Sequence, residues 1–463
     1  MRKTTSVTKR LQCKKLAKVK RDSADSNKFF NLLTSELLFN KLEDELPEHR
    51  ERLFHPTETL SMFLAQAMSG DRSCQNVVNR HAVERLCYGL KAPSVRTGGY
   101  CRARKRLPTH LVKCLTEHLA KEADTVASDK WRWRSKRVRI VDGTTLTMPD
   151  TEANQEAFPQ SGGQEPGLGF PICRLVGITS LETGMLMNAA VGRCSGKGGD
   201  EQTLLRSLWN TFESGDVILG DAYFATYFFI AEMQKRGIDL LLEQHGTRRQ
   251  STDFRKGKRL GHEDHIIEYP KPKLRPYWMN EKDYLDSPEV VRVRELKRKG
   301  KIYVTTLMCH KSYSKEELSG VYKQRWNIEI DLRHIKDTLG MNILSCKSPE
   351  MVTKEIWVYM LAYNLLRVLM AQSALLSDLV PRQLSFKHCL QLWSWTQVKF
   401  LGLESSQFQQ LMMLIAVQRN GERSGRIEPR AVKRRPKPYP LLTVPRDQAR
   451  EEVRKNGHPK KLK

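Results

Sequence analysis

Short apolar runs in the middle of the chain, next to segments with helical spacing, constrain the fold more than any other feature. Runs of this length, rich in β-branched residues and bounded by turn residues, are typical of strands. They lie at residues 138–141, 173–194, 217–221, 238–244 and 301–308. The second run is a hairpin, because LETG divides it into two halves. Helical patterns at 200–212 and 222–237 separate the later strands, so the order predicts a mixed α/β sheet.

Two aspartates stand at or just beyond the ends of these predicted strands. Asp142 follows the run Val138–Val141 and leads into a predicted turn, and Asp221 closes the run at 217–221. Thr144 follows the first of them and either bonds a phosphate or belongs to the turn. Acidic side chains that emerge from neighbouring strand ends are candidates for metal ligands, because hard cations prefer carboxylate oxygens.

A helix is predicted from Ser314, its N-cap, to Gly340, and it places four polar residues on one edge. At about 100° per residue, one sector of roughly 60° holds Tyr322, Arg325, Glu329 and Lys336, flanked by Arg333 and Trp326. The apolar stripe that should face the sheet consists of Ile328, Leu332, Ile335 and Leu339. The polar edge is either an ordinary exposed face with an Arg325–Glu329 pair or the wall of a site. Trp326 is expected to pack. Asp331 points away from that edge and Asp337 lies beyond Lys336, so neither is expected to be a ligand.

The charge of the chain favours the second interpretation of this edge. The sequence has 79 Lys and Arg against 52 Asp and Glu, a formal net charge of +27. Such a charge opposes compaction and usually has a polyanionic partner, nucleic acid first and an anionic membrane surface second. Three acids that converge on Mg²⁺, beside basic residues that hold phosphates, could cut a phosphodiester. Asp142, Asp221 and Glu329 are the candidate ligands.

The sequence argues against membrane and zinc functions. The most apolar stretch, 355–376, contains Glu355, Asn364, Arg367 and Gln372, so a buried amphipathic helix is expected rather than a span. The basic N-terminal stretch has no apolar core of signal-peptide length. Ten cysteines without a C-x-x-C pair are expected to be reduced thiols. The HEDH motif at 262–265 has no further ligand nearby and is expected to be a loop.

Changes in composition divide the chain into seven segments. They are a basic arm (1–28), a helical segment that is a candidate DNA-binding domain (29–130), two parts of the α/β core (131–244 and 301–350) around a β-rich insertion (245–300), a helical region (351–425) and a basic tail with prolines (426–463). The turn at Ser69–Asp71 fits a helix-turn-helix or a plain helical bundle. Three arginines in the second segment either follow a DNA backbone or begin a solvated helix, namely Arg102, Arg104 and Arg106.

The motifs together carry a resemblance. Tyr322, Arg325, Glu329 and Lys336 match the pattern Y-x2-R-x3-E-x6-K at every spacing. VDGT around Asp142, LGDAYF around Asp221, the YCRARKRL segment and the KRRPKPYP tail extend the match over most of the chain. On these residues the chain resembles the DDE-type bacterial insertion-sequence transposases, in the group called insertion sequence family four. The order of the two aspartates before the signature is the one this resemblance requires.

This resemblance implies an RNase H-like core in which Asp142, Asp221 and Glu329 hold two Mg²⁺ ions, with Mn²⁺ as a substitute. It implies cut-and-paste transposition: nicking at terminal inverted repeats, a hairpin intermediate and strand transfer to target DNA. Tyr322, Arg325 and Lys336 would hold the phosphate near the flipped end. The implied partners are double-stranded DNA and a second copy of the chain on two DNA ends, with no membrane. The implied location is the bacterial cytoplasm, in association with the nucleoid.

One feature of the group is missing here. Its members stack a flipped base on a Trp in the strand before the signature helix, where this chain has Tyr303. Tyr303 is expected either to stack on a base or to pack in the core, and Trp278 to pack. Arg248 and Arg249 follow the strand at 238–244 and either contact DNA or form a solvated turn.

Two other functions remain open on the sequence. One is a DNA-binding repressor or architectural protein without catalysis, and the other is an RNase H-like nuclease that only cleaves. The helical region from residue 351 to 420 is either a dimer contact or intramolecular core. Three carboxylates in the path of a polyanion favour catalysis over binding alone, because a pure binder has no need of them.

Overall fold

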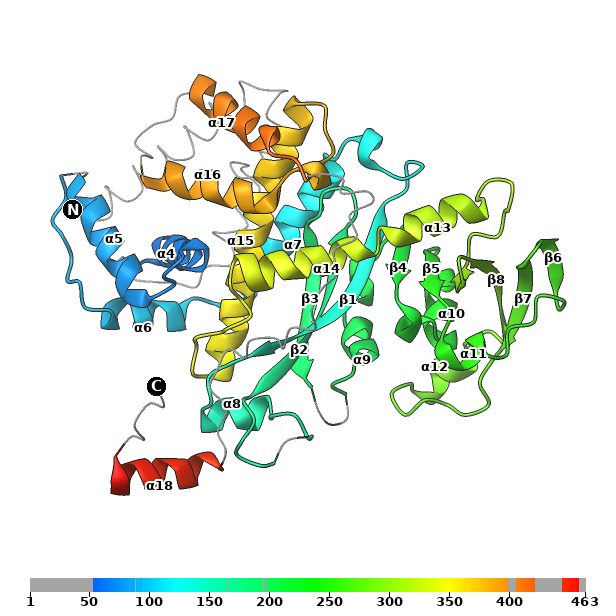
Figure 1. Ribbon diagram of the computed structural model, residues 1–463, viewed down its shortest axis with the longest axis horizontal. Coiled ribbons are helices and arrows are strands. Elements are labelled where there is room, and N and C mark those ends of the chain that lie inside the picture. The colour runs from blue at the N-terminus through cyan, green and yellow to red at the C-terminus, as the bar shows by residue number, and fades with distance from the viewer. Residues whose placement is uncertain are drawn as a thin grey trace.

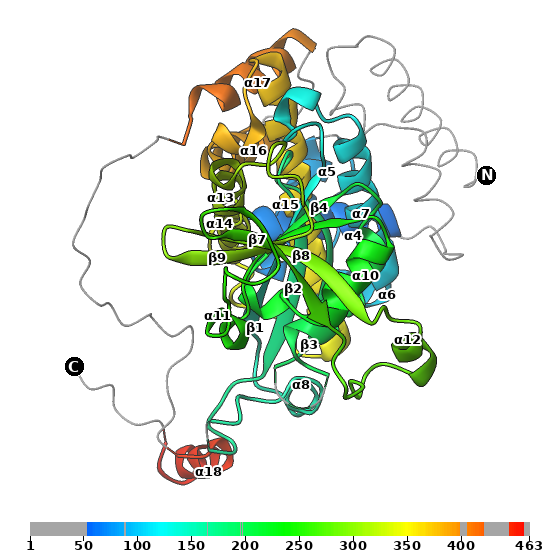
Figure 2. The same ribbon diagram turned by 90° about the vertical axis from the view of Figure 1, so that its right-hand side faces the viewer.

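The computed structural model describes residues 53–87, 89–163, 165–194, 196, 198–398, 405–420 and 444–457. The basic arm at 1–28 and most of the basic tail lie outside these residues. Figure 1 shows the N-terminal and C-terminal helices together on one side of a long sheet, whose far end is formed by β6, β7 and β8. Figure 2 shows the same sheet from that far end.

A nine-stranded mixed sheet forms the centre of the molecule, with the strand order β3-β2-β1-β4-β5-β9-β8-β7-β6. β2 is antiparallel to β1 and β3, whereas β4 is parallel to both β1 and β5. The strands are β1 (Val138–Thr147), β2 (Ile172–Ser180), β3 (Leu186–Arg193), β4 (Val217–Gly220), β5 (Asp239–Glu243), β6 (Lys258–Gly261), β7 (Asp264–Pro270), β8 (Val290–Arg298) and β9 (Lys301–Thr305). The predicted mixed α/β sheet is confirmed.

β1 is longer than the sequence predicted, so Asp142 lies inside the strand and not at its end. The strand pairs with β2 from Arg139, opposite Ser180, to Thr147, opposite Ile172. The alternation of buried and more exposed side chains continues beyond Asp142, because Leu146 is buried between two threonines. The β-branched side chains of these threonines also favour a strand. The predicted turn after Asp142 is therefore wrong, because pairing with a distant strand keeps the backbone extended.

The strands of segment 245–300 continue the central sheet. β8 pairs with β9, β9 pairs with β5, and all these neighbours are antiparallel. The insertion is thus attached edge to edge to the strand that precedes the signature residues. Its other described elements are the short helices α11 (Gly246–Arg249) and α12 (Glu281–Leu285).

Helices from both ends of the chain pack on one another, and one helix from each end contacts β3 at the edge of the sheet. The N-terminal set comprises α4 (Pro56–Met68), α5 (Cys74–Cys87), α6 (Gly98–Arg106) and α7 (Thr109–Thr125). The turn predicted at Ser69–Asp71 does separate the first two. The remaining helices are α8 (Glu152–Ala157), α9 (Glu201–Arg206), α10 (Tyr227–Lys235), α15 (Pro349–Leu376), α16 (Phe386–Val398), α17 (Ser405–Val417) and α18 (Arg446–Asn456).

Helix α15 is the one helix in the described residues that is long and apolar enough to cross a membrane. The protein buries 89% of its most apolar window, as expected of a core helix. It is buried on nearly all sides, so the prediction of an amphipathic helix is wrong in this respect. Its polar groups are satisfied internally: Asn364 bonds the backbone of Thr116 and Leu186.

The predicted signature helix is broken into three pieces. Ser314 caps α13 (Lys315–Lys323) as expected, accepting a hydrogen bond from the backbone N–H of Glu317. The chain then makes i to i−3 bonds at Gln324 and Arg325 before α14 (Trp326–Arg333) and the π-helical turn η5 (His334–Thr338). The stripe predicted to face the sheet is buried, with Ile328 and Ile335 fully so. Figure 1 shows α13 and α14 crossing one face of the sheet.

Candidate active site

One arginine joins two of the three predicted acids. The Arg325 guanidinium donates from Nη1 to Asp142 Oδ2 at 3.1 Å and from Nη2 to Glu329 Oε1 at 2.9 Å. Asp142 comes from β1 and Glu329 from the first turn of α14, which packs on β1. The Arg325–Glu329 pair expected of an ordinary helix face is present, but Asp142 makes it part of a half-buried site.

Asp221 lies close to this group at the end of the adjacent strand. It directly follows β4, which is parallel to β1, and its Oδ1 accepts a hydrogen bond from the Tyr223 N–H at 2.9 Å. Burial raises the pKa of Asp142, and the negative charges of Asp221 and Glu329 raise it further. Asp142 therefore responds to the charges of both other acids, as a member of a common site does.

The donor chemistry of the site suits a hard divalent cation. Carboxylate oxygens are the ligands that Mg²⁺ prefers, and a cation would relieve the repulsion felt by Asp142. Arg325 supplies the positive charge in this structure. Within the described residues, no group of three or more His, Cys, Asp or Glu is arranged closely enough to hold a metal ion. The acids are thus gathered but not preformed as a three-ligand cage.

The other signature residues are held by neighbours and not by the acids. Lys336 Nζ donates to Thr144 Oγ1 at 2.9 Å and to the Thr145 carbonyl at 3.0 Å. Tyr322 is buried, and its hydroxyl donates to Glu243 Oε2 at 3.4 Å. Burial raises the pKa of Tyr322, so it stays protonated. Arg333 is exposed on the same segment.

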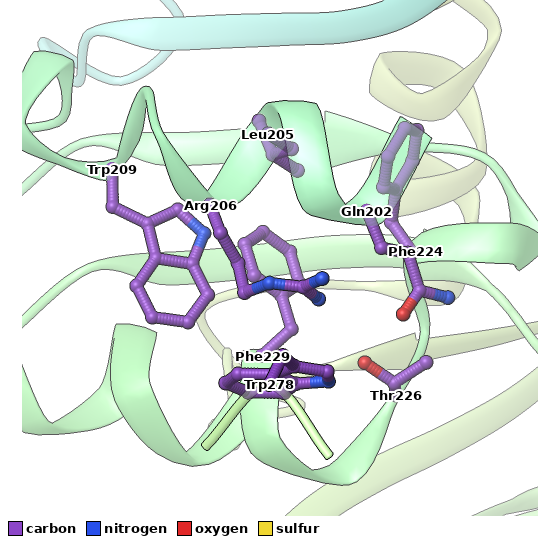
Figure 3. Close-up of a pocket in the computed structure, with 8 residues that line it drawn as sticks. All are labelled: Gln202, Leu205, Arg206, Trp209, Phe224, Thr226, Phe229 and Trp278. Carbon is purple, nitrogen blue, oxygen red and sulfur yellow. The ribbon is translucent and has the colours of Figure 1, made fainter. Parts of the chain in front are cut away.

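The predicted aromatic residues divide between core and surface. Tyr303 is 3% exposed, with its ring edge-on to that of Tyr322 at 4.9 Å, which favours core packing. Trp278 packs as expected, edge-on to Trp209 and under the Arg206 guanidinium at 4.1 Å (Figure 3). The cavity beside it has a volume of only about 10 Å³, enough for a water molecule. The packing role expected of Trp326 is wrong, because its side chain is 55% exposed beside Arg325.

The remaining candidate arginines lie in different surroundings. Arg102 and Arg106 are exposed on α6, and Arg249 is exposed on α11. The Arg248 guanidinium lies over the Tyr269 ring at 3.7 Å. The expectation that Arg104 contacts DNA does not fit its 5% exposure.

Arg104 instead joins the N-terminal helices to the core. Its guanidinium lies over the Phe63 ring at 4.0 Å and bonds the thiols of Cys74 and Cys346. Arg104 is buried because it lies on the face of α6 that packs against the protein, where Tyr100 and Ala103 are also buried. An arginine in a basic run can therefore have a purely structural role.

Two acids and two histidines that the sequence analysis did not name as metal ligands have other surroundings in the structure. Asp331 is fully buried between the guanidinium groups of Arg367 and Arg382, and Asp337 is exposed. The loop expected at HEDH is wrong for its second half, because Asp264 and His265 belong to β7 and are buried. His265 lies against Glu295 at 2.9 Å, while His262 in the preceding turn is exposed. The buried Asp331 and His265 therefore stabilise the fold through their polar contacts, and Asp337 and His262 lie on the surface.

The sequence analysis missed Glu201, the first residue of α9. An ideal Cβ placed on Gly143 would lie 2.5 Å from the Glu201 carboxyl carbon, so glycine after Asp142 leaves room for that carboxyl group. Burial raises the pKa of Glu201, as do the charges of Asp142 and Asp221. Side chains alternate along a strand, so Glu201 approaches β1 from the face opposite to Asp142. Two features of the sequence were related to this contact: the glycine directly after Asp142 and the helix predicted from residue 200. Neither of them specifies the contact, because they are distant in the chain.

Comparisons with known proteins show the family to which the chain belongs. The family described as "Transposase DDE domain" matches residues 133–365, which include all three acids. The transposase InsG for insertion sequence element IS4 of Escherichia coli strain K12 is 26% identical over 364 residues, covering 75% of this chain and 79% of that protein. A solved synaptic complex of the piggyBac transposase with hairpin DNA has a TM-score of 0.42 and 10% identity, over 85% of this chain and 86% of that one.

The chain belongs to the DDE transposase family, because the family match covers half of its length. It is a phosphoryl-transfer enzyme that acts on DNA, and the resemblance found in the sequence is confirmed. This family implies a divalent metal.

Proposed function

We propose that this transposase moves an insertion sequence by cut-and-paste transposition, with cleavage at terminal inverted repeats, a hairpin intermediate and strand transfer to target DNA. The convergence of Asp142 and Glu329 on Arg325, with Asp221 at the end of the adjacent parallel strand, carries the proposal. The acids come from three separate segments, and a common site accounts for the charges of Asp221 and Glu329 raising the pKa of Asp142.

An RNase H-like core is part of this proposal. Three antiparallel strands, β3-β2-β1, continue into the parallel strands β4 and β5, and a helix carrying the third acid crosses the sheet beside β1. The order of strands and helices along the chain is the one that the resemblance implies. The strands of 245–300 extend that core and do not interrupt it.

We propose that Asp142, Asp221 and Glu329 hold two Mg²⁺ ions, for which Mn²⁺ can substitute. Such ions supply Lewis-acid stabilisation of the charge that develops on the phosphate oxygens. The chain's own cationic groups would bind the DNA strand beside them. Arg325 has the planar fork that fits a phosphate with two parallel hydrogen bonds, and Lys336 provides a single charge at Thr144.

The covalent steps exchange one phosphate ester for another. Water attacks the phosphorus at the element end, a P–O bond breaks and a 3′-hydroxyl is released. That hydroxyl then attacks the opposite strand, so a new ester forms as the old one breaks and the end closes as a hairpin. A second water reopens the hairpin, and the same hydroxyl finally attacks target DNA.

Further parts of the proposal concern partners and location. A homodimer on two DNA ends would hold both element ends together for cut-and-paste movement. Exposed arginines, namely Arg102, Arg106, Arg249 and Arg333, are candidates for contacts with the DNA backbone. The net charge of +27 supports association with the bacterial nucleoid in the cytoplasm.

Labelled element ends with Mg²⁺ test the proposal. The wild type should give nicked, hairpin and joined products, and Glu329→Gln should bind the ends but cleave them at least about 100-fold more slowly. Asp337→Asn, an exposed acid on the same helical segment, is the control and should cleave at the wild-type rate. Normal cleavage by Glu329→Gln would contradict the assignment. Binding without nicking by the wild type would support a repressor, and nicking without joining would support a nuclease.

A further inference from the structure

The position of Arg325 has a consequence for the order in which the site binds its components. We propose that Arg325 is an internal counterion that keeps metal out of the free enzyme and releases the acids when a DNA phosphate takes its guanidinium. Metal loading would then depend on DNA binding. This inference rests on the proposed metal site at Asp142, Asp221 and Glu329.

The hydrogen bonds of Asp142 leave no oxygen of this carboxylate without a partner. Oδ2 accepts from Arg325 at 3.1 Å, and Oδ1 accepts from the Gly143 N–H at 2.8 Å. The Asp142 and Arg325 side chains are only 16% and 19% exposed, so water screens the pair weakly. A cation that binds Asp142 must therefore displace the guanidinium or share the carboxylate with a positive charge, which weakens its binding.

Arg325 holds Glu329 with the same group. Its second nitrogen bonds Glu329 Oε1 at 2.9 Å, so one guanidinium neutralises acids from β1 and α14 together. Two charge-assisted hydrogen bonds from one planar group are stronger than neutral ones. The absence of a preformed group of three metal-binding side chains in the described residues agrees with this arrangement.

A phosphate oxygen pair competes for this guanidinium. The spacing of donors in an arginine fits a phosphate as well as it fits carboxylates. Arg325 lies between the end of α13 and the start of α14. Its long side chain is partly exposed, so the guanidinium can reach a DNA phosphate. Transfer of the guanidinium to DNA would leave Asp142 and Glu329 as uncompensated negative charges. DNA and metal therefore favour the same rearrangement, and each should increase the affinity of the other by the same factor.

Lys336 provides a matched comparison within the same signature. Its ammonium group is bonded to Thr144 and Thr145 rather than to the acids. Removing the Lys336 charge should alter the general potential of the site without freeing a carboxylate. Removing the Arg325 charge should alter the potential of the site and also free the carboxylates of Asp142 and Glu329.

Mn²⁺ titration, followed by the electron paramagnetic resonance signal of the free ion, measures this directly. The proteins are the wild type, Arg325→Gln and Lys336→Gln, each full length, with and without a duplex of the element's terminal repeat. Without DNA, Arg325→Gln should bind Mn²⁺ about tenfold more tightly than the wild type, and Lys336→Gln within about twofold. DNA should tighten Mn²⁺ binding by the wild type about tenfold and by Arg325→Gln little.

Equal or weaker Mn²⁺ binding by DNA-free Arg325→Gln would overturn the counterion role. If Lys336→Gln without DNA bound Mn²⁺ as tightly as Arg325→Gln does, the counterion role would also be overturned. The loss of any positive charge near the site would then be enough to strengthen Mn²⁺ binding. Asp142→Asn tests the underlying metal site separately: if it binds Mn²⁺ like the wild type in the presence of DNA, the proposed ligands are wrong. Arg325→Lys serves if Arg325→Gln does not fold, and its affinity without DNA should lie between the expected values, because an ammonium group cannot bridge both acids in the same way.

Discussion

Four carboxyl groups gather around the strand that carries Asp142, and neighbouring acids raise the pKa of two of them, Asp142 and Glu201. Asp142 and Glu201 approach β1 from opposite faces, and the pKa values of both are raised by burial and by neighbouring acids. The closest cation to Glu201 among the described residues is Arg174, whose Nε lies 3.9 Å from Oε1. Such a loose pair leaves much of the Glu201 charge to act on the site.

Glu201→Gln should raise the Mg²⁺ concentration needed for half-maximal cleavage. It removes one negative charge while keeping the shape of the side chain, and a charge interaction of about 1 kcal/mol corresponds to roughly a fivefold change in affinity. Cleavage at saturating Mg²⁺ should remain near the wild-type rate. Glu152→Gln, on the exposed part of α8, is the control. An unchanged half-saturation point for Glu201→Gln would show that its charge does not reach the metal site.

At the scale of elements, the position of α14 depends on a buried acid two residues beyond Glu329. Asp331 bonds Arg367 of α15 and Arg382, and Arg382 also donates to the carbonyls of Ser180 and Leu181 at the end of β2. One charged cluster therefore ties α14 to the long core helix and to the strand beside β1. It fixes Glu329 and Arg325 relative to Asp142.

Asp331→Asn should destabilise the protein by about 3 kcal/mol, because two buried guanidinium groups would lose their carboxylate. Urea unfolding of the wild type and the variant measures this difference. Asp337→Asn changes an exposed acid six residues later and should stay within about 0.5 kcal/mol of the wild type. If Asp331→Asn lost as little free energy of unfolding as the Asp337→Asn control, the charged cluster would not anchor α14.

The π-helical turn after α14 should make stability depend on pH. His334 stacks on Phe386 at 4.7 Å, and burial, with the charges of Arg367, Arg333 and Arg382, lowers its pKa from 6.5 to about 4. The unfolded chain takes up the proton first as pH falls, so the contribution of neutral His334 is complete above pH 6.5 and is lost toward pH 4.

Urea unfolding at pH 6.5 and pH 4.5 tests this dependence. The wild type should lose about 2 kcal/mol more than His334→Gln over that interval, because glutamine does not titrate. Subtracting the two proteins removes the effect of other acids that titrate in the same range. Identical losses in both proteins would show that His334 is not kept neutral by its surroundings.

At the scale of the whole molecule, contacts between distant segments hold the sheet and its helices together. Lys354 of α15 donates to the carbonyls of Arg104 and Lys105 in the last turn of α6. At the other end, α18 lies near α8 in Figures 1 and 2 and is attached through its first residue. Arg446 pairs with Asp150, bonds the carbonyls of Gly167 and Gly169, and lies over the Phe170 ring at 4.2 Å.

Asp150→Asn should release α18 from this attachment. Amide hydrogen exchange of residues 446–456 should become about tenfold faster, as expected when a local contact of roughly 1.4 kcal/mol is lost. Mass spectrometry of peptides from that segment gives the rates. Asp447→Asn, which removes an exposed partner of Arg450, should leave the exchange close to that of the wild type. Equal exchange in Asp150→Asn would mean that the carbonyl bonds of Arg446 suffice.

The sequence by itself determined the features that depend on local spacing. The period of apolar residues gave the strands, the buried stripe of the signature helix and the cap at Ser314, because side-chain direction repeats with the backbone. The order of Asp142, Asp221 and Glu329 and the spacing of the signature identified the family and supplied the candidate acids of the site.

Only the tertiary structure decided what depends on partners distant in the chain. Pairing with β2 kept β1 extended beyond Asp142, and the packing of α6 turned Arg104 inward while Trp326 remained exposed. The same is true of Arg325, whose role between Asp142 and Glu329 follows from the distance between β1 and α14. Burial and charge pairing are properties of the assembled core, so no local pattern along the chain can specify them.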